Sequence, residues 1–190
     1  MKTMELETIR KELPKKFTAE ELEIAGMNIQ PSPFKSEALA TLEKELRCKF
    51  PVTFSGLLMK YDLGNLTLGP IQFGYESNYL ELLLEWNKEE TSGAWWGDGA
   101  RPNNWIAIAF TDPYILILDT ASEEIHGFLH EEGWKAHRRV ASDSESLLRG
   151  LGTLILQRKP SDKNGNLELG KTIAASVTSA DEAFWLNIAS

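Results

Sequence analysis

The chain has 190 residues, a formal net charge of −8 and 42% hydrophobic residues. This length suits one domain with a substantial buried core, and the composition lacks the low hydrophobicity of disordered chains. The excess of acidic residues argues against binding to nucleic-acid phosphates, which requires clustered lysine and arginine. The same charge balance suits a basic protein partner or simply keeps the protein soluble.

A single cysteine, Cys48, excludes an intramolecular disulfide and a zinc site built on several cysteines. Residues 1–17 mix charged residues with isolated apolar ones and contain no apolar run long enough for a signal peptide or a membrane span. We therefore expect a cytoplasmic protein that does not associate with membranes.

The first 35 residues predict a helical N-terminal extension. Residues 4–13 have the spacing of a short helix, and a second helix begins at the capping box of Thr18 and Glu21 and ends near Gly26. Residues 30–33, with two prolines, are typical of a linker.

A pair of helices meeting at a proline corner is predicted next. The first begins with Ser36 as its cap and has an apolar stripe of Leu39, Leu42 and Leu46. The second is started by Pro51 near its first position and ends within residues 62–65. Its apolar positions are Phe54, Leu57, Leu58 and Tyr61.

From residue 66 the period of the apolar residues changes to two, which predicts short strands over 66–68 and 71–75. A helix then starts at Ser77 or Asn78, with apolar residues towards the core and an acidic outer side. The acidic residues of that side are Glu81, Glu85, Glu89 and Glu90.

The second half of the chain predicts a loop, four strands and two helices. Residues 91–104 form a glycine-rich loop, and 105–110 with 114–118 form a hairpin at the centre of the sheet. Two more strands are expected over 125–130 and 135–140. A helix follows, opened by a capping box of Ser142 and Glu145. In the tail, a turn at 164–166 precedes a short helix opened by Ser179 and Glu182, whose aromatic residues should dock on the main domain.

This order of elements predicts an α+β fold with a mainly antiparallel central sheet flanked by helices. Three parts are expected: the N-terminal extension over 1–35, an α+β domain over 36–160, and a C-terminal appendage over 161–190 that docks on the domain.

The elements from about residue 37 to residue 156 resemble the SUKH superfamily in order and spacing. The similar features are the leading helix over 39–46, the segment 47–51 with its proline corner, the second helix that ends at Gly64, the strands at 105–110 and 114–119, and the closing helix over 142–151. The resemblance implies a SUKH-like α+β domain without a recognised enzymatic site. Most bacterial members are immunity proteins that neutralise a toxin delivered by contact-dependent or related systems, whereas fungal relatives regulate cell-wall synthesis and signalling. The helices before residue 37 and the tail after Pro160 lie outside the family's pattern.

Residue patterns of known catalytic sites are missing from the sequence. The motifs Gly-x-Ser-x-Gly and His-Glu-x-x-His do not occur, and Gly97–Gly99 is too short for a phosphate-binding loop. His126 and His130 share a face of the expected strand, and His137 follows, but a strand does not give the helical His-x-x-x-His geometry. We predict no catalytic residue, no metal site and no cofactor, and a packed or merely exposed thiol at Cys48.

The loop around Trp95 and Trp96 is the most unusual feature of the sequence. Adjacent residues of an extended chain point in opposite directions, and tryptophan is enriched at binding hot spots, so one ring is a candidate partner contact. The alternative is that both rings anchor the loop to the sheet. The candidate partner-binding residues are Trp95, Trp96, Asp98, Glu81, Glu85, Glu89, Glu131 and Glu132.

The leading hypothesis from the sequence is a non-enzymatic protein-binding module, in concrete terms an immunity protein whose acidic side chains steer a basic toxin domain. A regulatory scaffold for an endogenous protein is the alternative. The third hypothesis is a metal-dependent enzyme that uses the histidines.

Overall fold

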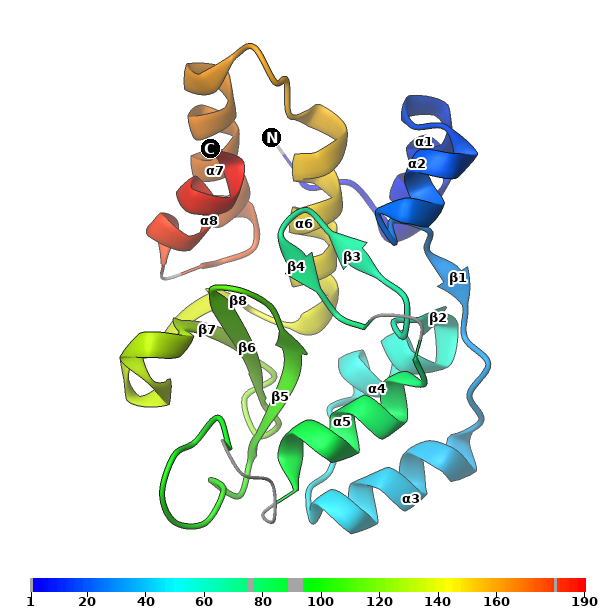
Figure 1. Cartoon of the computed structure of the whole chain (residues 1–190), viewed down its shortest axis with the longest axis vertical. Helices are drawn as coiled ribbons and strands as arrows, with labels where there is room; N and C mark the ends of the chain where they lie inside the picture. Colours follow the sequence, from blue (N-terminus) through cyan, green and yellow to red (C-terminus); the bar gives the residue numbers. More distant parts are fainter. Residues whose placement is uncertain (1, 75–76, 89–93, 180) are drawn as a thin grey trace.

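A four-stranded antiparallel sheet and a long helix beside it organise the chain (Figure 1). The computed structural model describes residues 2–74, 77–88, 94–179 and 181–190. The strands are β5 (Trp105–Phe110), β6 (Tyr114–Asp119), β7 (Ile125–Leu129) and β8 (Arg138–Ala141), in the order β5-β6-β7-β8. The long helix is α6 (Ser144–Gln157). The fold is α+β with an antiparallel sheet flanked by helices, as predicted.

The β5–β6 hairpin is confirmed, but its expected place at the centre of the sheet is wrong for β5, which is an edge strand. Its edge is covered by α5 (Tyr79–Asn87). The Asn87 side chain donates to the carbonyl of Ala107 and accepts from its amide, as a neighbouring strand would. Ile108 is a bulge residue in the β5–β6 register, and its carbonyl accepts from the Tyr79 hydroxyl.

The C-terminal segment covers the opposite edge, at β8. The Ser142 amide donates to the carbonyl of Val177, and the Asp181 amide donates to that of Arg139. A register shift in β7–β8 leaves Val140 as a bulge residue whose carbonyl accepts from the Trp185 indole. Side chains and the tail therefore occupy hydrogen-bonding groups at both edges.

At the N-terminus, α1 (Leu6–Lys16) packs on α6, and α2 (Ala19–Ile24) follows. The predicted capping box of Thr18 and Glu21 is present, and Gly26 adopts φ +63° just beyond the end of α2. The Lys16 ammonium group donates to the carbonyl oxygens of Ile155, Leu156 and Arg158, at the C-terminal end of α6. This extension is thus fixed to the main helix.

The proline corner joins α3 (Ser36–Leu46) to α4 (Val52–Lys60). Ser36 is the first residue of α3 and does not cap it, since Lys35 holds the cap position. Pro51 likewise sits one residue earlier than expected, at the N-cap of α4. The first two residues of the linker expected over 30–33 form β1 (Gln30–Pro31), which pairs with β2 (Tyr61–Asp62).

The short strands after Leu66 are β3 (Thr67–Leu68) and β4 (Ile71–Gln72), an antiparallel pair. Helix α5 begins after Asn78, whose side chain accepts from the Leu80 amide. Tyr75 of the expected strand and Glu89 and Glu90 of the expected acidic side lie outside the described residues.

Other predictions for the second half were wrong wholly or in part. The strand expected over 135–140 is present only in part: β8 begins at Arg138, and two short 3-10 helices, η1 (His130–Glu132) and η2 (Trp134–Ala136), precede it. Asp143 caps α6 in place of the predicted box of Ser142 and Glu145. The turn expected at 164–166 lies inside α7 (Lys163–Ser176), which Asp162 caps.

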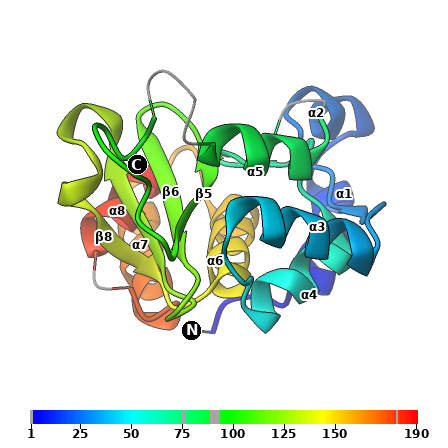
Figure 2. The same cartoon turned by 90° about the horizontal axis from the view of Figure 1, so that it is seen from below.

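The last helix is α8 (Glu182–Ala189), and its cap is Asp181 in place of Ser179. Phe184 and Trp185 are buried, as predicted for aromatic residues that dock on the domain. Helix α6 lies between the α7–α8 pair and α1 in both views (Figures 1 and 2). Among the described helices, none has the length and apolar character needed to span a membrane.

Candidate partner-binding surface

The side chains of Trp95 and Trp96 are buried beneath the backbone of their own loop and are 3% and 4% exposed. The Trp95 indole donates to the Asn87 side chain, and the Trp96 indole donates to the carbonyl of Gly99. The rings meet edge to face, with 5.4 Å between their centroids. Both anchor the loop to the sheet, so the prediction that they contact a partner directly is wrong for this conformation. Residues 95 and 96 form a turn, and neighbouring side chains in a turn can point the same way, unlike those of an extended chain.

These two rings belong to a second, smaller core on one face of the sheet. Its other buried members come from β5, β6 and β7: Ala107, Ile115, Ile117 and Phe128. Trp86, Trp105 and Trp134 pack around them. The opposite face of the sheet contributes to the main core, where Tyr114 contacts Phe184 of α8.

The carboxylates predicted to meet a partner are exposed where the structure describes them. Glu81 and Glu85 lie on the outer side of α5, Asp98 lies at the tip of the loop, and Glu131 and Glu132 form part of η1. The loop runs between α5 and the η1–η2 segment in both views (Figures 1 and 2). We call these five residues the acidic surface; Lys88 and Lys135 are exposed lysines on the same segments.

The tryptophan core gives the acidic surface a firm support. Trp134 of η2 contacts Trp95, with 6.3 Å between the ring centroids, so the segment that carries Glu131 and Glu132 is tied to the loop that carries Asp98. Asn87 at the end of α5 accepts a hydrogen bond from the Trp95 indole. All three segments are thus held in place through Asn87 and one cluster of aromatic rings.

Two histidines and two tryptophans pack together at the rim of this core. Trp105 contacts both imidazoles, His126 at 4.9 Å and His137 at 4.7 Å between ring centroids. The imidazoles lie 5.0 Å apart, and His137 stacks parallel to Trp134. The Nδ1 atom of His137 is 2.7 Å from the carbonyl oxygen of Trp134.

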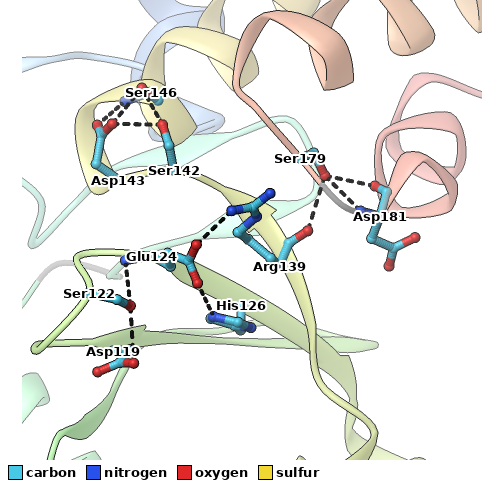
Figure 3. A network of polar contacts seen from close by, with 10 residues as sticks. All are labelled: Asp119, Ser122, Glu124, His126, Arg139, Ser142, Asp143, Ser146, Ser179 and Asp181. Atoms are coloured by element: carbon cyan, nitrogen blue, oxygen red, sulfur yellow. Dashed lines mark hydrogen bonds and ion pairs between the residues drawn. The ribbon is translucent and has the colours of Figure 1, made fainter.

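Glu124 links His126 to Arg139 across the neighbouring strand (Figure 3). Its carboxylate lies 2.6 Å from the Arg139 guanidinium and 3.4 Å from Nε2 of His126. Burial lowers the pKa of His126, the positive charge of a protonated His137 lowers it further, and the Glu124 carboxylate opposes both effects. His126 is therefore held towards its neutral form.

The histidines do not form the arrangement that a strand over 125–130 would give. Strand β7 ends at Leu129, and His130 is exposed at the start of η1, so it does not share a strand face with His126. Within the described ranges, no group of three or more histidine, cysteine, aspartate or glutamate side chains could hold a metal ion. The Cys48 thiol is partly buried, and burial raises its pKa, which disfavours the reactive thiolate.

Several residues of this region were missed from the sequence. Trp105 was assigned to a strand without a role in the site, and Trp134 fell between two expected strands. The missed ion pair joins Glu124, just before β7, to Arg139 of β8, 15 positions further along the chain. The outer face of α4, where Val52 and Met59 are exposed, was also missed. A helical wheel of residues 52–60 would have placed these two apolar residues opposite the predicted stripe.

Comparison of the chain with models of protein families, with curated proteins and with solved structures found no match.

Proposed function

We propose that the chain is a protein-binding module that recognises a basic partner through its acidic surface, and that this partner is a toxin domain that the module neutralises. The observation that supports the proposal is the set of exposed carboxylates of α5, the loop and η1, on segments tied together by buried tryptophans. Carboxylates on a rigid support attract and orient a cationic protein. The resemblance of residues 37–156 to the SUKH superfamily supports the same kind of activity.

Charge reversal tests this proposal. The variant Glu81→Lys with Glu85→Lys should slow association with a purified basic nuclease-toxin domain by about tenfold or more at low salt, and the difference should shrink as ionic strength rises. The matched control is Glu20→Lys with Glu23→Lys on α2, which changes the net charge equally at two exposed positions. Surface plasmon resonance against a panel of such domains from the same source provides the rates.

Three outcomes would contradict the proposal. A partner whose association with both variants slows equally would respond to net charge alone. An association rate that does not depend on salt would remove the steering role of the carboxylates. A panel in which no domain binds the wild-type chain would contradict toxin neutralisation.

A further inference from the structure

The segment over residues 131–137 makes local backbone hydrogen bonds and packs only shallowly. The amide of Ala136 donates to the carbonyl of Gly133, and that of His137 donates to the carbonyl of Trp134. Neither η1 nor η2, each of which the structure describes in full, contains a buried residue. A segment with these properties opens more easily than the core of a domain.

Aromatic rings attach this segment to the sheet. Trp134 lies 6.4 Å from Trp105 of β5 and 6.3 Å from Trp95, measured between ring centroids. The His137 ring lies 4.7 Å from Trp105 and 5.0 Å from His126 of β7, whose side chain is 12% exposed. The attachment therefore includes two imidazoles that pack against each other.

Hydrogen-bond partners fix the place of the proton on each neutral imidazole. Nε2 of His126 lies 3.4 Å from the Glu124 carboxylate (Figure 3), and Nδ1 of His137 lies 2.7 Å from the carbonyl oxygen of Trp134. Because these oxygens only accept, both nitrogens carry the hydrogen. A further proton on His126 must then bind Nδ1. That atom is buried and has no hydrogen-bond partner among the described residues, so the new N–H would lack an acceptor.

The charges around the pair balance one imidazolium but not two. Glu124 and Asp119 are the carboxylates that act on His126, and Glu124 is already paired with Arg139 at 2.6 Å. The other charged groups of the packed elements are exposed to water or bonded to carbonyl groups: Glu131, Glu132 and Lys135 of the segment, Arg138 of β8 and Arg101 beside β5. One imidazolium at His137 is favoured by its parallel stacking on Trp134. A second one, 5.0 Å away, meets its repulsion.

We propose that residues 131–137 form a pH-sensitive flap, which leaves the sheet when His126 takes up a proton beside a protonated His137, while the rest of the chain stays folded. The flap carries Glu131 and Glu132, so its opening would also remove two carboxylates from the acidic surface. The opening is a property of the chain alone and does not rest on the proposed function.

The direction of the pH dependence follows from the two states of His126. In the open flap the imidazole is solvated and has the ordinary pKa of histidine, about 6.5. In the closed flap, burial and the charge of His137 lower that pKa, so opening takes up a proton. The closed flap is therefore favoured above about pH 6.5. Below it, the opening constant should rise about tenfold for each pH unit, until the pH passes the lower pKa of the closed state.

Fluorine NMR of the full-length chain labelled with 5-fluorotryptophan, from about pH 8 to about pH 5, tests the proposal. The Trp134 resonance, assigned by its loss in Trp134→Phe, should move towards its position in the urea-unfolded chain. The Trp185 resonance should stay in place over the same range, because this ring is buried in the main core. A flap that stays closed to about pH 5, or joint movement of both resonances, which would mean that the whole chain unfolds, would each overturn the proposal.

Histidine variants decide which group is responsible. His126→Phe keeps a ring in the cluster but cannot bind a proton, and it should lower the opening constant at about pH 5 by about tenfold or more. His126→Gln should do the same, which separates loss of the proton from the effect of a larger ring. His137→Phe should open less than the wild type, since one repulsion is removed. His130→Phe, at an exposed position, is the matched control and should open as the wild type does.

The proposal fails if both His126 variants open as the wild type does, because the proton would then bind elsewhere. It fails equally if His137→Phe opens as readily as the wild type, since the two imidazoles would not act on each other. A His130→Phe variant that stays closed would assign the pH dependence to His130 instead.

Discussion

The Asn87 side chain hydrogen-bonds to the β5 edge in the place of a neighbouring strand. Its amide group donates to the carbonyls of Leu83 and Ala107, and its carbonyl oxygen accepts from the Ala107 amide and the Trp95 indole. A buried polar group without a partner costs about 1–3 kcal/mol. The side chain therefore satisfies several groups that water cannot reach.

We predict that Asn87→Leu lowers the free energy of unfolding by about 3 kcal/mol or more, because Ala107 and Trp95 lose their buried partners. Asn78→Ala, which removes the cap of the same helix and an exposed hydrogen bond to Glu81, should cost about 1 kcal/mol. Urea unfolding followed by tryptophan fluorescence gives both values. Equal losses in the two variants would mean that Asn87 acts as an ordinary helix residue.

His126 should make stability depend on pH. Its pKa in the folded chain is lowered by burial and by a protonated His137, so the unfolded chain, with a pKa of about 6.5, binds the proton more tightly. The stabilising contribution is complete above that value and is lost as the pH falls through the folded pKa. We predict that His126→Phe flattens the fall in unfolding free energy below about pH 6.5.

The control for this pH effect is His130→Phe, since His130 is exposed and should leave the pH profile of the wild-type chain unchanged. Chemical unfolding across a pH series measures the slopes. Acidic residues titrate in all of the proteins, so the difference between each variant and the wild type is the relevant quantity. Parallel profiles for the wild type and His126→Phe would contradict the predicted desolvation.

At the scale of elements, substitution to alanine should lower the stability of the chain at two helix glycines and raise it at a third. A Cβ at Gly150 would lie 2.5 Å from the Trp185 ring, and one at Gly152 would lie 2.7 Å from Ile9, whereas Gly56 has open space. We predict that Gly150→Ala and Gly152→Ala each destabilise by about 1–3 kcal/mol through overpacking. Gly56→Ala should stabilise by about 0.5–1 kcal/mol.

Differential scanning calorimetry of the three alanine variants gives this comparison directly. The two α6 glycines allow α8 and α1 to approach the helix from different sides, so their variants should lower the melting temperature while the α4 variant raises it. A rise for Gly150→Ala would show that Trp185 can move aside without loss.

Helices with regular apolar spacing were predictable because the apolar residues of one face recur every three or four positions along the sequence. Leu39, Leu42 and Leu46 of α3 are an example. The cap at Thr18 was predictable for the same local reason. The box of Ser142 and Glu145 was wrong because Asp143, one residue later, offers its carboxylate to the Ser146 amide. Aspartate and serine are comparable caps, so tertiary placement decided between them.

The candidate site was only partly predictable, because the direction in which a side chain points depends on its packing partners. The exposure of Glu81 and Glu85 followed from the helical period of α5. The burial of Trp95 and Trp96 depends on Asn87, Phe128 and Trp134, which are brought to them only by the folded sheet. No local pattern contains that information.

At the scale of the whole molecule, the sequence predicts a separate appendage after residue 160. In the structure this tail is bonded to the β8 edge and contributes to the core. Ser142 and Arg139 of the β8 edge bond to residues 177, 179 and 181, and the buried Trp185 donates to the bulge at Val140. Gly150 of α6 packs directly against the Trp185 ring. Removing the tail would expose this apolar surface and the β8 edge together.

We predict that the chain truncated to residues 1–160 loses cooperative unfolding, because the surface that Phe184 and Trp185 cover becomes exposed to water. Fragment 161–190, expressed with it from a second gene, should restore a single thermal transition by docking in place. Circular dichroism melting of the truncated chain, alone and co-purified with the fragment, measures the effect. A truncated chain that melts cooperatively near the wild-type temperature would instead identify residues 161–190 as a true appendage, and failure of the fragment to restore the transition would show that the covalent connection between α6 and α7 is itself required for folding.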